Sequence, residues 1–197
     1  MRRSWCRICR RRASCGCSVD LPALTEIGHL ILRSRIKVVG MLTTILLFCF
    51  LLGCVAGLRS LTAPAAVCWG AHLGWLHLAE TRLAFLGHIA TLIIFTLLAL
   101  LELVADKLPK TPARTATPGL IARILTGAFC GSALAVSAGA SLMVAAVVAI
   151  VGALVGTFAG YNIRHGLVTR AHLPDFAVAL VEDVIAIVGG LLIVSHL

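Results

Sequence analysis

Charged side chains interrupt two long apolar segments of this sequence. Glu102 and Asp106 lie four residues apart at the end of a Leu-rich run, and Lys107 follows directly. Residues at this spacing share one face of a helix. Glu182 and Asp183 stand inside a second run, "FAVALVEDVIAIVGG". A charge at the centre of a bilayer costs about 2.5–3.5 kcal/mol, so such side chains usually face a partner or a water-filled cavity.

Two arginines lie at similar positions in neighbouring apolar segments. Arg123 falls in the first turn of the run 119–137, and Arg164 follows the run 140–160. We expect these guanidinium groups to meet the carboxylates at one depth. The cluster would then be either an ion-pair lock that holds helix ends together, or a polar site for a proton, a cation or a lipid headgroup.

Arg59 and Ser60 follow the first apolar run and are a separate candidate. An arginine in this place could bind a lipid phosphate or an anionic solute. It could equally mark the end of a membrane segment, with its charged group reaching the interface.

The elements that carry these residues are too apolar for a soluble domain. Of 197 residues, 60% are hydrophobic and only 13% are charged, whereas about 25% are charged in a typical soluble protein. Several runs approach the roughly 20 residues needed to cross a bilayer. The sequence therefore predicts an all-α, multi-pass transmembrane bundle with the lipid bilayer as its main partner.

The net charge of +9 belongs mostly to residues 1–40, which contain nine of the 17 Arg and Lys residues. This head has no interleaved aromatic residues and no nucleic-acid motif, so we expect no nucleic-acid binding. Its cysteines, Cys6, Cys9, Cys15 and Cys17, match no zinc spacing. We interpret residues 1–40 as a basic, Cys-rich extension, disordered or a mis-assigned start, and residues 41–197 as the integral membrane domain.

Five crossings are predicted, over residues 41–58, 83–105, 119–137, 140–160 and 176–194. The stretch 62–78 is short and carries two Trp and two His residues, which favours a re-entrant or interfacial helix. Five crossings place the basic loops 106–118 and 161–175 in the cytoplasm together with the N-terminus, and the C-terminus outside, as the positive-inside rule requires. A sixth crossing by 62–78 would move the first of these loops outside.

Glycines four residues apart line one face of three predicted spans. In lipid, such faces let two helices approach closely. We expect them to pack the bundle, and they could also pair two copies into a homo-oligomer. The glycines are Gly53, Gly57, Gly127, Gly131, Gly152, Gly156 and Gly160.

No catalytic motif is evident: the sequence has no G-x-S-x-G, no P-loop and no HExxH. His72, His77 and Glu80 match no metal spacing that would predict a site. We therefore expect no enzyme activity, no cofactor and no metal.

Four stretches together resemble a known family. They are "GLRSLTAPAAVCWGAHLGWL", "ELVADKLPKTPART", "ARILTGAFCGSAL" and "VEDVIAIVGG". They resemble the bacterial membrane family catalogued as domain of unknown function 4126, over roughly residues 42–195. The resemblance implies a multi-pass protein of the bacterial cytoplasmic membrane and implies no substrate. It gives added importance to Arg59, Glu102, Asp106, Lys107, Pro109 and Glu182.

Three functions stay open at this point. A small transporter- or channel-like protein would use the carboxylate and arginine cluster in a water-accessible cavity. A non-transporting membrane scaffold or assembly factor would use the same cluster only for stability. A lipid-acting membrane enzyme would need a nucleophile or metal beside it.

Overall fold

A computed structural model describes residues 21–105, 117–170 and 174–197, with side chains described from residue 33 onward. The chain divides into two compact units, Met1–Met41 and Leu42–Leu197. The predicted extension 1–40 falls in the first unit. Helix α1 (Leu21–Leu58) begins inside it, and its four cysteines lie outside the described residues. The fold below concerns the second unit.

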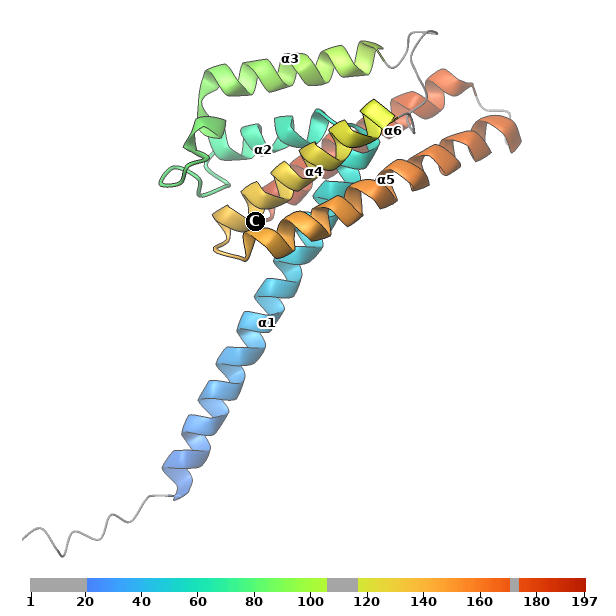
Figure 1. Ribbon diagram of the computed structural model, residues 1–197. Helices are drawn as coiled ribbons and strands as arrows, with labels where there is room; N and C mark the ends of the chain where they lie inside the picture. The colour runs from blue at the N-terminus through green and yellow to red at the C-terminus, as the bar shows by residue number, and fades with distance from the viewer. Residues whose placement is uncertain (1–20, 106–116, 171–173) are drawn as a thin grey trace, which may run out of the picture. The chain divides into compact units, whose positions relative to one another are not determined.

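All regular structure in the described ranges is helical, which confirms the predicted all-α class. Figure 1 shows the helices along the chain. After α1 come α2 (Thr62–His72), the 3-10 turn η2 (Ala84–Gly87), α3 (Ile89–Ala105), α4 (Thr117–Ser137), α5 (Leu142–Arg170) and α6 (Asp175–Ser195).

Four described helices are long and apolar enough to cross a membrane: Arg33–Leu58 of α1, α4, α5 and α6. The membrane class is thereby confirmed. The predicted crossing 83–105 is shorter than expected, because backbone at His88 is extended and α3 starts only at Ile89. Its 17 residues span about 25 Å.

The stretch 62–78, predicted as a re-entrant or interfacial helix, contains one short helix that lies inside the bundle. Only α2, 11 residues long, is helical, and every residue from Thr62 to Cys68 is buried. Helix α2 packs against α3, α4 and α6, and Figure 1 shows it between α3 and the remaining helices of this unit. It ends before Gly74, whose φ of +78° lies in the left-handed region that glycine adopts without strain.

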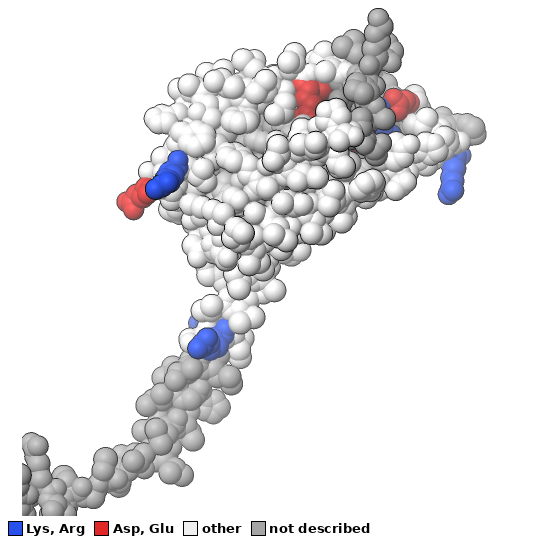
Figure 2. Space-filling view, viewed as in Figure 1, with Lys and Arg blue, Asp and Glu red and all other residues white. Residues whose placement is uncertain are grey.

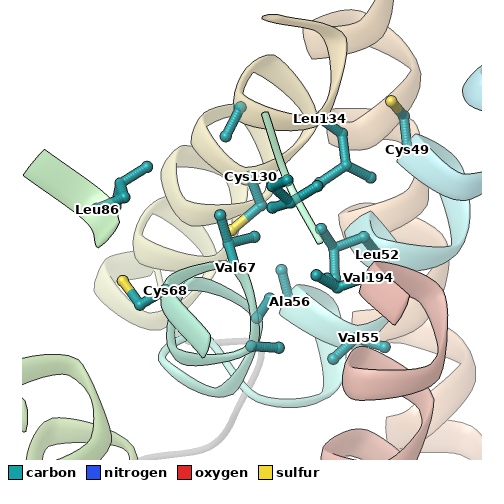
Figure 3. Close-up of a cluster of buried hydrophobic side chains, with 14 of the residues drawn as sticks. Cys49, Leu52, Val55, Ala56, Val67, Cys68, Leu86, Cys130, Leu134 and Val194 are labelled. Carbon is teal, nitrogen blue, oxygen red and sulfur yellow. The ribbon is translucent and has the colours of Figure 1, made fainter. Parts of the chain in front are cut away.

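The core lies between α1, α2, α4 and α6. Figure 3 shows Leu52, Val67, Cys130 and Val194 gathered there from these four helices, and each is fully or almost fully buried. Cys49, Cys68 and Cys130 are free thiols in buried positions, as expected of cysteines that act as small apolar residues.

Helices α1 and α5 make backbone contact through small residues. A methyl group added at Gly53 or Gly57 would overlap the carbonyl oxygen of Ala149 or Ala153 in α5. Added at Gly152 or Gly156, it would overlap carbonyl oxygens in α1. These two glycine pairs therefore face a neighbouring helix of the same chain.

Further contacts of small residues strengthen the packing of α1, α4 and α5. The Thr157 hydroxyl donates to the carbonyl oxygen of Gly57 at 3.1 Å and to that of Ala153 at 2.8 Å. In α4, Gly127 and Gly131 pack on the methyl groups of Ala153 and Ala149. Gly160 of α5 faces the Leu58 side chain.

The helices of the unit Leu42–Leu197 alternate in direction. Gly70, near the end of α2, lies against Val194, near the end of α6. The backbone N–H of His77 donates to the Ser137 hydroxyl, at the end of α4, at 3.0 Å. The ends of α2, α4 and α6 therefore lie together at one end of the bundle. The placement of the N-terminus in the cytoplasm and the C-terminus outside stays a prediction. The length criterion missed α2, because a short helix is tolerated at membrane depth when protein surrounds it.

The surface of this unit is almost free of charge in the view of Figure 2, where white atoms cover the helices and charged side chains are few and separated. Large apolar side chains such as Leu101, Leu125 and Met143 are more than 60% exposed. Such a surface suits contact with lipid tails.

Candidate functional site

A break between α1 and α2 forms the centre of the site. Helix α1 ends at Leu58, and α2 begins at Thr62. The backbone N–H of Arg59 still donates to the carbonyl oxygen of Val55 at 2.8 Å. The Arg59 side chain is completely buried, and its Nη2 group forms an ion pair with Oδ1 of Asp183 in α6. Asp183 is itself only 6% exposed.

Glu102 of α3 is bound by the same break. Its Oε1 accepts hydrogen bonds from the backbone N–H of Ser60 at 2.8 Å and from the Ser60 hydroxyl at 2.7 Å. Its Oε2 accepts from the backbone N–H of Leu61 at 2.8 Å. The three donors thus occupy both carboxylate oxygens and link α3 to the residues just before α2.

A second ion pair lies where α5 meets α6. Arg164 donates from Nε and Nη2 to the two oxygens of Asp175 at 2.8 and 2.7 Å. Its Nη1 lies 3.9 Å from Oε2 of Glu182. The Glu182 side chain is one-tenth exposed, whereas that of Asp175 is 60% exposed. The Arg164–Asp175 pair is therefore more exposed to solvent than the Arg59–Asp183 pair.

The remaining candidates fall in different places. Arg123 is 6% exposed and lies in α4, one turn before Gly127, which approaches Ala56 of α1. Asp106 and Lys107 lie outside the described residues.

The structure corrects the expected position of Arg59. The five-crossing layout placed Arg59 and Ser60 at the opposite face from Glu102 and Asp183, yet these four residues are in contact. The reason is the short α2 described above. It returns the chain across the bundle, so that α1 and α3 end on the same side.

Sequence reasoning did not identify two participants, Leu61 and Asp175, and it assigned no role to Thr62. Leu61 acts only through its backbone N–H, and a backbone donor has no sequence signal. Asp175 could have been found, since an acid in the first turn of an apolar helix is a common N-terminal feature. Thr62 is buried, and its hydroxyl has no hydrogen-bond partner among the described residues.

Two cavities flank this region on different faces of α6. One, of about 140 Å³, lies between α2, α3 and α6 and is lined by Thr62, Trp69, Thr96 and Leu103 among others. The other, of about 530 Å³, lies between α5 and α6, and both Arg164 and Glu182 line it. Asp183, one partner of the buried ion pair, lies in α6, and α6 borders both cavities.

Ion binding and solute binding are the chemistry that this arrangement allows. The site has carboxylates, guanidinium groups and backbone donors. Within the described ranges, no group of three or more His, Cys, Asp or Glu side chains is placed to hold a metal.

A helical bundle with four spanning helices and a charged junction buried inside it defines a multi-pass integral membrane protein. More specifically, the chain belongs to the family described as domain of unknown function DUF4126, whose model matches residues 46–196. No curated protein and no solved structure matches the chain.

Proposed function

We propose that this chain is a small transporter-like membrane protein whose polar centre is the break between α1 and α2. The observation that carries the proposal is the complete burial of Arg59, paired with Asp183, at an interrupted helix. Broken helices are a common way for membrane carriers to bind solutes, because the break offers backbone groups and helix ends inside the bundle.

Energetics also support a functional role. A buried ion pair is weak evidence for stability, since desolvation of both charges offsets most of their attraction. In a chain with only 13% charged residues, an apolar pair at these positions would stabilise the fold at least as well. We infer that the charges are kept for what they bind or move.

The two cavities provide candidate routes to this centre. Glu182, next to Asp183 in sequence, lines the larger cavity together with Arg164. Glu102 holds the break at the side of the smaller one. In the proposed carrier, a proton or small ion reaches the centre through Glu182, and movement of α3 opens the other side.

A non-transporting scaffold is the second candidate, and one observation favours it. Glu102 has both oxygens occupied by three short hydrogen bonds, which is the arrangement of a lock between helices. A scaffold predicts that Glu102→Gln lowers stability and that the protein carries no flux.

Reconstitution into sealed liposomes tests the proposal. Proton, sodium, potassium and small-carboxylate fluxes should exceed those of empty liposomes, and Asp183→Asn should abolish the flux that is found. Glu80→Gln is the matched control, because it removes an exposed carboxylate that lies outside the site. Absence of every flux from folded wild-type protein would contradict the proposal and leave the scaffold.

The proposal places the chain in the cytoplasmic membrane of a bacterium, as the family resemblance implies, and fractionation of a tagged chain tests this location. Both ends of the unit Leu42–Leu197 would face one side. Association into a homo-oligomer stays a prediction. It would need a surface other than the α1 and α5 glycine faces, which are filled within the chain.

A further inference from the structure

The turn between α1 and α2 has the donors of a carboxylate-binding site. Ser60 N–H, Ser60 Oγ–H and Leu61 N–H converge on one carboxylate at 2.7–2.8 Å. Hydrogen bonds from neutral donors to a carboxylate are among the strong ones. The N-terminus of α2, which follows directly, adds a favourable potential for negative charge. The occupant seen here, Glu102, comes from the chain itself.

A buried hydroxyl next to these donors indicates room for another ligand. Thr62 is 6% exposed, and its Oγ1 has no hydrogen-bond partner among the described residues. An unsatisfied buried hydroxyl costs about 1–3 kcal/mol, so its presence calls for a partner. Thr62 also lines the cavity of about 140 Å³ between α2, α3 and α6.

The size and lining of this cavity restrict the ligand. Its wall is apolar apart from Thr62, Thr96 and the Trp69 ring. An engineered protein cavity of about 150 Å³ binds benzene. A ligand of this place would therefore have a short apolar body and one carboxylate.

Few buried contacts hold helix α3, which carries Glu102. Only Leu92 and Ala99 of its 17 residues are buried, so few apolar contacts hold it, and elements with few buried contacts open most readily. The cavity lies directly under α3, lined by Ala99, Leu100 and Leu103.

We propose that a small monocarboxylate replaces Glu102 on Ser60 and Leu61, with its apolar body in the cavity beneath α3 and its second interaction at Thr62. This inference rests on the proposed transport function and names its substrate class. Glu102 then acts as an internal ligand that closes the site when the solute is absent.

Chemical rescue tests the site. In purified Glu102→Ala, propionate should raise the melting temperature by about 3 °C at ten times its Kd, as expected for a ligand that binds only the folded state. Propionamide, which has the same shape without the charge, should give no rise. Adding Ser60→Ala should weaken propionate binding about tenfold, since one hydrogen bond to a charged group is worth roughly that factor. Glu80→Ala, which removes an exposed carboxylate outside this site, is the matched control and should show no rescue.

A second measurement covers the case in which Glu102→Ala does not fold. The second protein keeps Glu102, has its native cysteines replaced, and carries Ala99→Cys. This cysteine should react slowly with a maleimide, because Ala99 is 9% exposed. Propionate should slow this reaction several-fold further, because its apolar body would cover the cavity wall at position 99, and propionamide should not. The carboxylate site would be overturned if propionate and propionamide had the same effect on the melting temperature of Glu102→Ala. If that variant does not fold, the same effect of both compounds on the labelling rate of Ala99→Cys would overturn it.

The outcomes separate the two proposals. Rescue by propionate without any flux in liposomes would support the carboxylate site and overturn the transport function. Proton or cation flux without rescue or protection by propionate would support transport and overturn the carboxylate site.

Discussion

Breaking the buried Arg59–Asp183 pair should destabilise the protein far more when one partner is changed than when both are. Arg59 is 0% exposed and Asp183 6%, so either single change removes one charge of an ion pair that is shielded from solvent. We expect Arg59→Met or Asp183→Leu to lower the free energy of unfolding by about 3–5 kcal/mol. The double variant should recover most of this loss, because an apolar pair of similar volume replaces a buried ion pair at little or no cost.

The wild type, the two single variants and the double variant are unfolded in mixed micelles by increasing concentrations of a denaturing detergent. Tryptophan fluorescence then gives the free energy of unfolding of each of the four proteins. The coupling between the two residues should reach several kcal/mol, as expected for contacting residues in one ion pair. Arg164 and Asp175 provide the matched control, because the Asp175 side chain is 60% exposed. Their coupling should be about 0–1 kcal/mol.

A coupling at Arg59 and Asp183 no larger than that of the control pair would refute the reasoning, since the two charges would then not depend on each other. A stable double variant should still fail in the liposome assay. Retained flux in that variant would separate the ion pair from transport.

The remaining predictions concern packing, direction and thiol access. Gly156→Ala should lower the free energy of unfolding by about 1–3 kcal/mol, because the added methyl group overlaps the Cys54 carbonyl. Gly166→Ala, in open space on the same helix, should raise it by about 0.5–1 kcal/mol. Equal effects of the two changes in thermal unfolding would contradict the assigned α1–α5 contact. Single cysteines at His77 and Leu197 should react with an impermeant maleimide from the same side of the membrane, and a single cysteine at Thr169 should react from the opposite side. Reaction at positions 77 and 197 from opposite sides would show that the helices do not alternate in direction. The native Cys130 thiol, 0% exposed, should be modified only after unfolding, and mass spectrometry of briefly labelled folded protein would detect any earlier reaction.

Helix positions were largely predictable from hydropathy. The runs 119–137 and 176–194 correspond to α4 and α6 within two residues at each end, because long apolar segments in lipid must satisfy their backbone as helices. Helix α5 continues ten residues beyond the predicted 140–160, through polar residues that hydropathy excludes but that a helix accommodates outside the lipid.

The sequence predicted which charged residues belong to the candidate site, but it did not predict which of them pair with each other. Glu102, Glu182, Asp183 and Arg164 stand out because charge is costly in an apolar segment. Their partners depend on which helix ends meet, and that depends on α2. Eleven residues are too few to count as a crossing, so the charge rule for loops favoured a layout that separated Arg59 from the acids.

By itself, the amino-acid sequence determined the membrane class and the residues whose charge requires a partner, since both follow from local composition and spacing. It also contained the stretches that resemble the family. The tertiary structure alone decided that Arg59 pairs with Asp183, that Glu102 binds Ser60 and Leu61, and that an unsatisfied Thr62 borders a cavity. The physical reason is that these contacts join residues more than 40 positions apart. The burial of one short helix, which no local pattern encodes, brings them to the same end of the bundle.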